Sequence, residues 1–547
     1  MDSHLERRAR AWLAEDPDPD TRAELSALLD AGDVAGLRSR FDGRLQFGTA
    51  GLRGPLGAGP LRMNRVIVRR AAAGLVDYLL STSPSVAGAS GAGVVVGYDA
   101  RHKSDVFALD TARVLAAAGI TARLMPCPLP TPLLAFAVRY TGAAAGVMVT
   151  ASHNPPADNG YKVYLPDGSQ IVPPIDGEIS ACIDSVPAGD VPLAAEDDPR
   201  IETIDVRAAY LDAVAAVPFL PGTRDVRVAY SALHGVGRDL LLAAFARAGF
   251  DPPVVVARQG DPDPDFPTVS FPNPEEPGAM DLLVALAAQT GADVAIANDP
   301  DADRLAVAVP DSASPTGWRQ LSGNEVGWLL ADHVLANTSG DDRLVVTTVV
   351  SSRLLSRLAA AYGVHYAETL TGFKWIAKEI RDRVGQRFVF GYEEALGYLV
   401  DDVVRDKDGI SAALVMAEIA ALAKSDGVTL LDRLDQIAAR VGRYRTAQWS
   451  LRTGAATIHA VLARLHEEPP HALGPFRVER VDERPEASLV MLSLGGDDRV
   501  LVRPSGTEPK VKFYFEVVDR DPQEVVDAMR AWVARTPALL DDHHSPN

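Results

Sequence analysis

The sequence predicts an α/β protein of three or four domains. The chain has 547 residues, which is more than one hydrophobic core normally supports. Short apolar runs that end in Gly, Asp or Ser alternate with helix-like segments in three successive blocks, which is typical of βα units. The C-terminal region differs, because two apolar strands there flank a turn. Such a layout places ligand loops at the carboxyl ends of strands.

The elements of the first block follow from hydrophobic patterning. Residues 1–44 are charged and helix-like, and closely spaced glycines at 47–54 end that pattern. We expect Ser104 to cap a helix that continues to Gly119, and a second helix to begin after Thr131. Expected strands cover residues 94–99, 122–125 and 146–149.

A stretch rich in proline and acidic residues, 186–199, is expected to be a linker. The later elements are expected as strands at 226–230, 254–256, 293–297, 344–350, 387–390, 500–503 and 511–516, and helices at 239–248, 354–362 and 525–533. We therefore predict an N-terminal α/β domain over 1–200, a second over 201–318, a third over 319–442 and a C-terminal α+β domain over 443–547.

Composition limits the partners. With 54 basic and 73 acidic residues, the net charge of -19 opposes binding to nucleic acid or an anionic membrane. No apolar run approaches the ~20 residues of a membrane span, and the N-terminus has no apolar signal region, so we expect a cytoplasmic protein. Cys127 and Cys182 are too few for a disulfide framework or a thiolate metal site.

Ser152 is a candidate reactive group. It follows the apolar run 146–149, and Pro155 and Pro156 prevent a helix from enclosing it. An ordinary turn serine is the simpler alternative. A hydrolase elbow requires G-x-S-x-G, whereas Thr150 and Asn154 flank this serine, and the sequence has no Walker A motif.

Asp299, Asp301 and Asp303 follow another apolar run with a spacing of two, so their side chains can converge on one cation. Oxygen-only ligation favours Mg²⁺ or Mn²⁺ over zinc. An EF-hand is excluded, because its glycine and glutamate positions hold Arg304 and Pro310. A solvated acidic turn is the alternative, but a buried strand in front of the turn favours metal binding.

Two further loops carry candidate ligands. Residues 503–510 join two strands, and Arg503, Ser505, Gly506 and Thr507 supply the donors that a phosphate requires. Glu393 and its acidic neighbour follow a strand and could accept hydrogen bonds from sugar hydroxyls. Taken alone, these two acids are better explained as a helix N-terminus.

Together these motifs resemble the α-D-phosphohexomutase superfamily, which includes phosphoglucomutase and phosphomannomutase. The segments 150–155, 299–304, 391–397 and 503–507 occur in the family's order and span about residues 45–516. The resemblance implies three α/β domains with mixed sheets and a smaller α+β C-terminal domain around a central cleft. It also implies that Ser152 is the phosphoserine and that one Mg²⁺ contacts it and the three aspartates.

The resemblance assigns further roles. Lys162 matches the family lysine that helps to move protons, and Arg53 matches an arginine that faces the reacting phosphate. His153 is a candidate partner of the serine, and Glu393 and Lys374 are candidate sugar-phosphate ligands. The chain departs from many members in its sugar loop, where Ala395 and Gly397 replace a serine and a histidine.

The predicted reaction interconverts hexose 1-phosphate and hexose 6-phosphate, with glucose or mannose as the sugar, through a bisphosphate that also serves as activator. A phosphopentomutase is the alternative, because the sugar loop resembles that of the family branch that contains both phosphoglucomutases and phosphopentomutases. A non-catalytic sugar-phosphate sensor would predict damage at Ser152 or the aspartates, and the sequence shows none. The expected partners are small sugar phosphates, and the choice between monomer and homodimer stays open.

Overall fold

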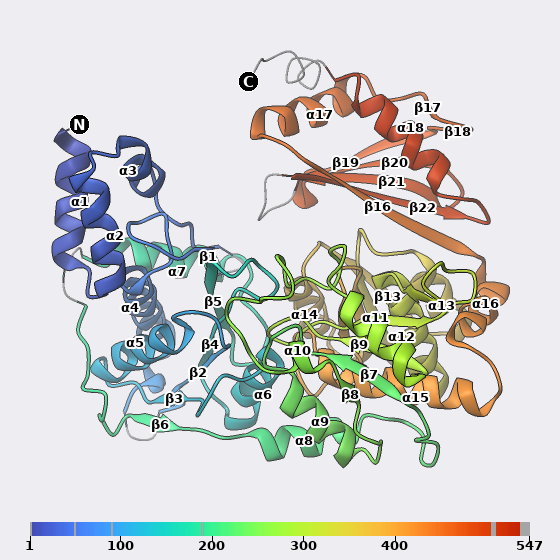
Figure 1. Cartoon of the computed structure of the whole chain (residues 1–547), viewed down its shortest axis with the longest axis horizontal. Helices are drawn as coiled ribbons and strands as arrows, with labels where there is room; N and C mark the ends of the chain where they lie inside the picture. Colours follow the sequence, from blue (N-terminus) through green and yellow to red (C-terminus); the bar gives the residue numbers. More distant parts are fainter. Residues whose placement is uncertain are drawn as a thin grey trace. The chain divides into compact units, whose positions relative to one another are not determined.

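The computed structural model describes residues 3–48, 51–88, 91–187, 189, 191–504 and 510–536. The chain forms two compact units, and Figure 1 labels their helices and strands. The first contains residues 1–321, 373–384 and 395–427, and the second contains 322–372, 385–394 and 428–547. Among the described helices, none combines the length and the apolar character that crossing a bilayer requires.

Three helices begin the first unit, as the charged N-terminal pattern predicts. They are α1 (Ser3–Glu15), α2 (Pro19–Asp30) and α3 (Val34–Phe41). The side chains of Asp18 and Asp33 cap α2 and α3 by accepting backbone N–H groups. A separate small core, which includes Trp12 and Phe41, holds these helices together.

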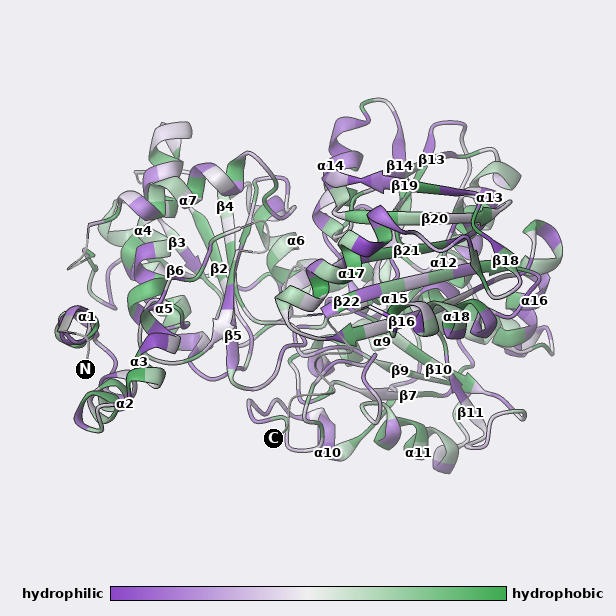
Figure 2. Cartoon of the chain, turned by 90° about the horizontal axis from the view of Figure 1, so that it is seen from above, coloured by the Kyte–Doolittle hydropathy of each residue, from purple (hydrophilic) through white to green (hydrophobic). Residues whose placement is uncertain are grey.

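The first sheet has six strands in the order β1-β5-β4-β2-β3-β6 and is mixed, as predicted. Strands β4, β2, β3 and β6 run parallel, whereas β5 and β1 run antiparallel to their neighbours. Figure 2 shows the hydrophobic character of the central strand β4, which is wholly buried. The elements are β1 (Leu52–Pro55), α4 (Arg65–Thr82), a 3-10 turn (Pro84–Val86), β2 (Val94–Tyr98), α5 (Ser104–Ala117), β3 (Ala122–Leu124), α6 (Thr131–Thr141), β4 (Ala145–Val149), β5 (Asp158–Tyr164), α7 (Ile175–Ser185) and β6 (Ile201–Thr203).

The predicted cap of α5 is wrong. Lys103, with φ +66°, occupies the N-cap position, and no side chain caps the helix there. Ser104 is the first helical residue, and its Oγ instead donates to Asp99 Oδ1 at 2.7 Å. The carboxylate at the end of β2 competes successfully for the hydroxyl, because a buried carboxylate needs donors.

The second sheet, also in the first unit, has the order β11-β10-β9-β7-β8. Strands β8, β7 and β9 run parallel, and β10 and β11 return antiparallel. The loop after β9 carries the three aspartates. The elements are α8 (Arg207–Ala215), β7 (Val228–Ser231), α9 (Arg238–Arg247), β8 (Val254–Val255), α10 (Ala257–Gly260), α11 (Asp281–Thr290), β9 (Val294–Ala297), β10 (Ala306–Pro310) and β11 (Trp318–Gln320).

The third α/β domain divides between the units. In the second unit, β13, β12 and β14 lie side by side and parallel. These elements are α12 (Gly323–Asn337), β12 (Arg343–Thr348), α13 (Leu354–Tyr362), β13 (His365–Thr369), β14 (Arg387–Glu393) and α16 (Leu430–Val441). The first unit holds the remaining three, which are α14 (Phe373–Asp382), β15 (Gly397–Leu399) and α15 (Gly409–Ser425).

The C-terminal part of the second unit is an antiparallel sheet in the order β16-β22-β21-β20-β19. Helices α17 and α18 contribute to its core, which includes Val461, Phe513 and Met529. The elements are β16 (Tyr444–Arg452), α17 (Ala455–Glu467), β17 (Ala472–Leu473), β18 (Phe476–Arg477), β19 (Arg480–Arg484), a 3-10 turn (Pro485–Ala487), β20 (Leu489–Gly495), β21 (Asp498–Pro504), β22 (Lys510–Val518) and α18 (Gln523–Val533). This antiparallel sheet with two helices matches the predicted α+β architecture.

Candidate active site

Ser152 lies in a tight loop directly after β4. Its φ is +52°, a left-handed conformation that is uncommon for a residue other than glycine. Its backbone N–H donates to Thr150 Oγ1 at 2.9 Å, which closes the turn. Ser152 therefore lies just beyond the carboxyl end of a wholly buried strand in the interior of the sheet.

The aspartate cluster occupies the loop after β9. Carboxylate oxygens of Asp299, Asp301 and Asp303 lie within 4.8 Å of one another, and all three residues are buried. Ala302 between them has φ +55°, so the loop is tightly folded. Thr131, the first residue of α6, donates from Oγ1 to Asp301 Oδ2 at 2.7 Å and from its N–H to the Asp301 carbonyl at 3.0 Å.

The structure brings the serine and the aspartates together. Ser152 Oγ donates to Asp299 Oδ2 at 2.7 Å, although 147 positions separate the two residues. Asp301 Oδ1 and Asp303 Oδ1 are buried and have no hydrogen-bond partner among the described residues. The cation nearest to Asp303 Oδ1 that the structure records is Arg304 Nε at 3.8 Å, beyond hydrogen-bond distance. Buried carboxylate oxygens without donors are favourable positions for a bound cation. This all-oxygen set fits a hard divalent ion such as Mg²⁺.

The three carboxylates differ in their electrostatics. Burial, together with the charges of Asp301 and Asp303, raises the pKa of Asp299 well above its ordinary value. For Asp301, burial alone would raise the pKa, but the charge and hydrogen bond of Lys162 outweigh it and lower the pKa. Of these two carboxylates, Asp299 is therefore the one whose protonated form the site favours when no cation is bound.

Two buried lysines contact the cluster. Lys162 Nζ lies 2.9 Å from Asp301 Oδ2 and 3.4 Å from Asp303 Oδ2. Burial would lower the pKa of Lys162, but these two carboxylates raise it, so the ammonium stays charged. Lys407 Nζ lies 3.3 Å from Asp303 Oδ2 and 3.1 Å from Asp406 Oδ1. These cations offset much of the negative charge.

Arg53 and His153 line the serine loop. Arg53, on β1, donates to Asn154 Oδ1 at 3.2 Å, and burial lowers its pKa from the ordinary value. His153 Nδ1 lies 3.2 Å from Ser152 Oγ. Burial, and then the nearby arginines, lower the pKa of His153 well below its usual range, so the neutral form of the ring is favoured.

The other predicted ligands are distributed over both units. Lys374 is the second residue of α14 in the first unit. Glu393 ends β14 and Arg503 lies in β21, both in the second unit. Ser505, Gly506 and Thr507 lie outside the described residues. The acidic neighbour Glu394 accepts hydrogen bonds from Thr348 and Ser351 at 3.2 and 3.1 Å, so it does not begin a helix.

Sequence reasoning missed several residues that support the site. Asp99 and Arg101 follow β2, just as Asp299 and Arg304 follow β9. This repeated pattern, an aspartate and then an arginine directly after a buried strand, could have indicated that Asp99 and Arg101 belong to the site. Arg304 donates to the Ala395 carbonyl at 2.6 Å and pairs in a β-bridge with Gly397. The sugar loop is thereby tied to the aspartate loop within the first unit.

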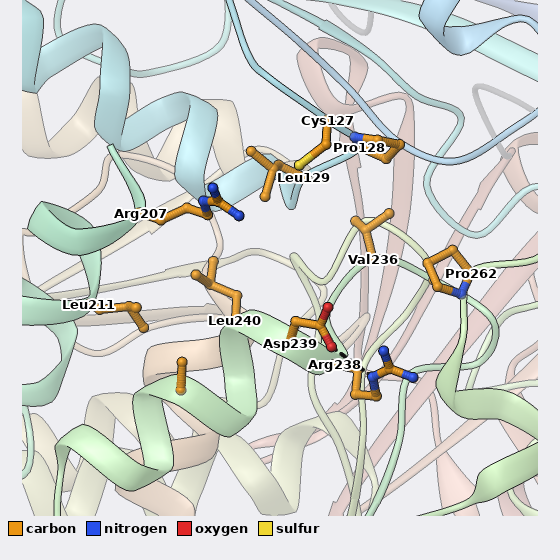
Figure 3. A pocket seen from close by; sticks show the side chains of 12 residues that line it. Cys127, Pro128, Leu129, Arg207, Leu211, Val236, Arg238, Asp239, Leu240 and Pro262 are labelled. Atoms are coloured by element: carbon orange, nitrogen blue, oxygen red, sulfur yellow. Dashed lines mark hydrogen bonds and ion pairs between the residues drawn. The ribbon is translucent and has the colours of Figure 1, made fainter. Parts of the chain in front are cut away.

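A separate cavity of about 350 Å³ lies in the first unit (Figure 3). Cys127, Leu129 and Leu240 are among its lining residues. Its arginines are already paired, since Arg238 contacts Asp239 and Asp261, and Arg207 contacts Asp205. The cavity therefore offers a phosphate no uncommitted cation, and the aspartate cluster remains the candidate active site.

The fold and the cluster fit an α/β enzyme of phosphoryl transfer. A hydroxyl and a carboxylate set that could bind a metal follow two parallel strands, and two buried lysines lie beside them. The phosphoglucomutase/phosphomannomutase domain models match this chain in order. α/β/α domain I covers residues 44–189, domain II 208–312, domain III 322–441 and the C-terminal domain 491–531.

Curated proteins of three activities are similar to the chain. A probable phosphomannomutase of Haemophilus influenzae is 44% identical, covering 84% of this chain and 94% of that protein. The mouse phosphopentomutase is 33% identical, covering 94% and 91%. The human glucose 1,6-bisphosphate synthase is 34% identical, covering 94% and 90%. The chain belongs to the phosphoglucomutase/phosphomannomutase family of the α-D-phosphohexomutase superfamily, and it is a phosphomutase of the isomerase class.

Proposed function

We propose that this chain interconverts hexose 1-phosphate and hexose 6-phosphate, with glucose or mannose as the sugar, and that Ser152 carries the phosphoryl group. The observation that carries this proposal is the 2.7 Å contact between Ser152 Oγ and Asp299 Oδ2. That contact puts a hydroxyl beside a metal-binding carboxylate set. The similarity to the Haemophilus influenzae probable phosphomannomutase supports a hexose substrate.

The reaction has two phosphoryl transfers. The free hydroxyl of the sugar monophosphate forms a new P–O bond with the phosphoryl group as the Ser152 Oγ–P bond breaks, and the hydroxyl proton ends on Ser152 Oγ. The resulting bisphosphate turns around and returns its other phosphoryl group to Ser152. A sugar bisphosphate therefore also acts as the activator that loads the serine.

The chain's own residues supply positioning and charge. Lys162 and Arg53 are cations beside the loop, and they would stabilise the charge that develops on the transferring group. The neutral His153, 3.2 Å from Ser152 Oγ, can accept the serine proton when the serine is loaded. Asp299, Asp301, Asp303 and phosphorylated Ser152 would hold one Mg²⁺, which when bound withdraws charge from the phosphoryl oxygens.

The phosphate that does not react needs a second site. We assign it to the loop of Arg503, Ser505, Gly506 and Thr507, because a planar guanidinium, hydroxyls and close backbone amides suit a phosphate. Arg503 Nε is buried without a hydrogen-bond partner among the described residues, which supports a ligand there. Glu393 and Lys374 are assigned to the sugar hydroxyls and phosphate.

A coupled assay tests the proposal. Glucose 1-phosphate, mannose 1-phosphate and ribose 1-phosphate would be compared with Mg²⁺ and a catalytic amount of bisphosphate. Ser152→Ala should abolish turnover with an unchanged melting temperature, and mass spectrometry should find phosphate on Ser152 of the wild type only. Ser185→Ala, an exposed serine on α7, is the matched control and should stay active. Full activity of Ser152→Ala would refute the covalent route.

A phosphopentomutase is the second candidate. The mouse phosphopentomutase matches nearly the whole chain, and Ala395 and Gly397 leave the sugar loop without the serine and histidine side chains of many family members. A higher kcat/KM for ribose 1-phosphate than for either hexose 1-phosphate would establish this second candidate.

A further inference from the structure

Arg101 makes an unusual set of hydrogen bonds beneath the serine loop. It lies between β2 and α5, and only 4% of its surface is exposed. Its Nη2 donates to the carbonyls of Ser152 and Asn154 at 2.6 and 2.7 Å. Its Nη1 donates to those of Pro155 and Asp158 at 2.8 and 3.2 Å. One side chain therefore holds most of the loop's backbone.

Asp99 fixes the same loop from the end of β2. Its Oδ1 accepts the Arg101 N–H at 3.1 Å and Ser104 Oγ at 2.7 Å. Its Oδ2 accepts Thr150 Oγ1 at 2.7 Å, and Thr150 Oγ1 in turn accepts the Ser152 N–H at 2.9 Å. The reactive serine is thus bound through both its N–H and its carbonyl to one buried network.

An aromatic side chain of the second domain, Phe266, packs against the Arg101 guanidinium. The Arg101 guanidinium lies 5.0 Å from the ring centre of the buried Phe266, within the range of a cation–π contact. The His153 ring lies 6.4 Å from that of Phe271, five residues further along the same segment. Since Arg101 is covered and its four terminal N–H groups are occupied, it contacts backbone rather than substrate.

We propose that Arg101 is a positioning residue that keeps Ser152 in its left-handed conformation, with Oγ directed at the aspartate cluster, through the four carbonyls it binds. This inference rests on the proposed role of Ser152. A non-glycine residue with φ +52° is strained, and such strain persists only where the surroundings over-determine the backbone. The four hydrogen bonds and the Asp99 network are that constraint.

Lysine should not replace Arg101. It keeps the charge but has one nitrogen with three donors, and therefore cannot hold four carbonyls in a planar fork. Arg101→Lys should lower kcat about 100-fold, because a displacement of about 1 Å at a reacting atom costs about that much. The KM for glucose 1-phosphate should change less than about threefold, because the sugar ligands are elsewhere.

The test compares Arg101→Lys with Arg113→Lys in the full chain. Arg113, on α5, also donates to a backbone carbonyl, that of Ala194 at 2.8 Å, but away from the serine loop. Quenched-flow measurements would follow transfer of phosphate from Ser152 to glucose 1-phosphate in one turnover. We expect a slow transfer step for Arg101→Lys only, with the Mg²⁺ affinity unchanged. An Arg101→Lys enzyme with wild-type kcat and transfer rate would overturn the inference.

Thr150 gives an independent variant should Arg101→Lys not fold. Thr150→Val keeps the shape but removes the hydroxyl that links Ser152 to Asp99, whereas Thr150→Ser keeps the hydroxyl. We expect slow transfer for the valine variant and recovery in the serine variant. A Thr150→Val enzyme that transfers phosphate as fast as the Thr150→Ser enzyme would overturn the inference. A wild type that never phosphorylates Ser152 would instead overturn the proposed function, and this role with it.

Discussion

The carboxylate cluster should release about one proton for each Mg²⁺ it binds. Burial and the two neighbouring carboxylates raise the pKa of Asp299 well above the ordinary 3.8, whereas Lys162 lowers that of Asp301. A divalent cation on the cluster favours the ionised form of every carboxylate. The proton held on Asp299 must therefore leave when the ion binds.

The release of one proton per Mg²⁺ ion sets how steeply the Mg²⁺ affinity depends on pH. Over the pH range in which Asp299 is protonated, the affinity should rise tenfold per pH unit, which is about 1.4 kcal/mol. The sign for stability follows from the raised pKa of Asp299 in the folded protein. The stabilisation that Asp299 contributes is complete below pH 3.8. It is lost as the pH rises through the pKa of Asp299 in the folded protein, unless Mg²⁺ is bound. The gap in melting temperature between loaded and metal-free protein should therefore widen with pH.

Titration calorimetry measures this directly. Mg²⁺ would be titrated at a series of pH values above 3.8 in two buffers of different ionisation enthalpy, which gives the number of protons released at each pH. Asp299→Asn should bind more weakly and release none, and Asp311→Asn, outside the cluster, should behave as wild type. A wild type whose Mg²⁺ affinity is independent of pH, with no proton released, would refute the assignment of the proton to Asp299.

Three further predictions concern stability. A Cβ on Gly235 would lie 2.3 Å from Pro300 backbone, so Gly235→Ala should lower the free energy of unfolding by about 1–3 kcal/mol and weaken Mg²⁺ binding. An Mg²⁺ affinity that calorimetry finds unchanged in this variant would contradict the prediction. Burial raises the pKa of Asp401 to about 7, so the wild type should lose at most about 4 kcal/mol between about pH 4 and 7, and Asp401→Asn should remove most of this slope in melting temperature; an equal slope in both proteins would argue against it. Arg499 and Glu516 form a buried pair at 2.8 Å, so Arg499→Met should destabilise the second unit by about 3–5 kcal/mol in thermal unfolding, with recovery in Arg499→Met/Glu516→Leu, and a double variant no more stable than the single one would contradict this.

Local patterns were sufficient for the architecture. The apolar run before Asp299 forms β9, and the run before Ser152 forms β4. Both strands are wholly buried, and a strand buried on both faces needs a continuous apolar run of this kind. Three α/β domains with mixed sheets and the different C-terminal domain are confirmed. Strand periodicity and turn residues are local, and the chain encodes them within a few positions.

Contacts across long sequence separations could not be predicted in the same way. Arg101 reaches Pro155, 54 positions away, and Lys407 reaches Asp303. Both side chains also have an acidic partner close in sequence, Asp99 for Arg101 and Asp406 for Lys407, but nothing in the sequence marks the distant partners. The expected cap at Ser104 failed for a local reason, because the buried carboxylate of Asp99, five residues earlier, accepts a hydrogen bond from its hydroxyl.

The charges of the site also explain why metal and phosphate belong together in this family member. Phosphorylation of Ser152 would add up to two negative charges at an oxygen that now lies 2.7 Å from Asp299. In a buried site such repulsion costs several kcal/mol, and Lys162 and Lys407 are already engaged with Asp301, Asp303 and Asp406. A divalent cation would offset this repulsion and let a phosphorylated Ser152 and the carboxylates occupy one site.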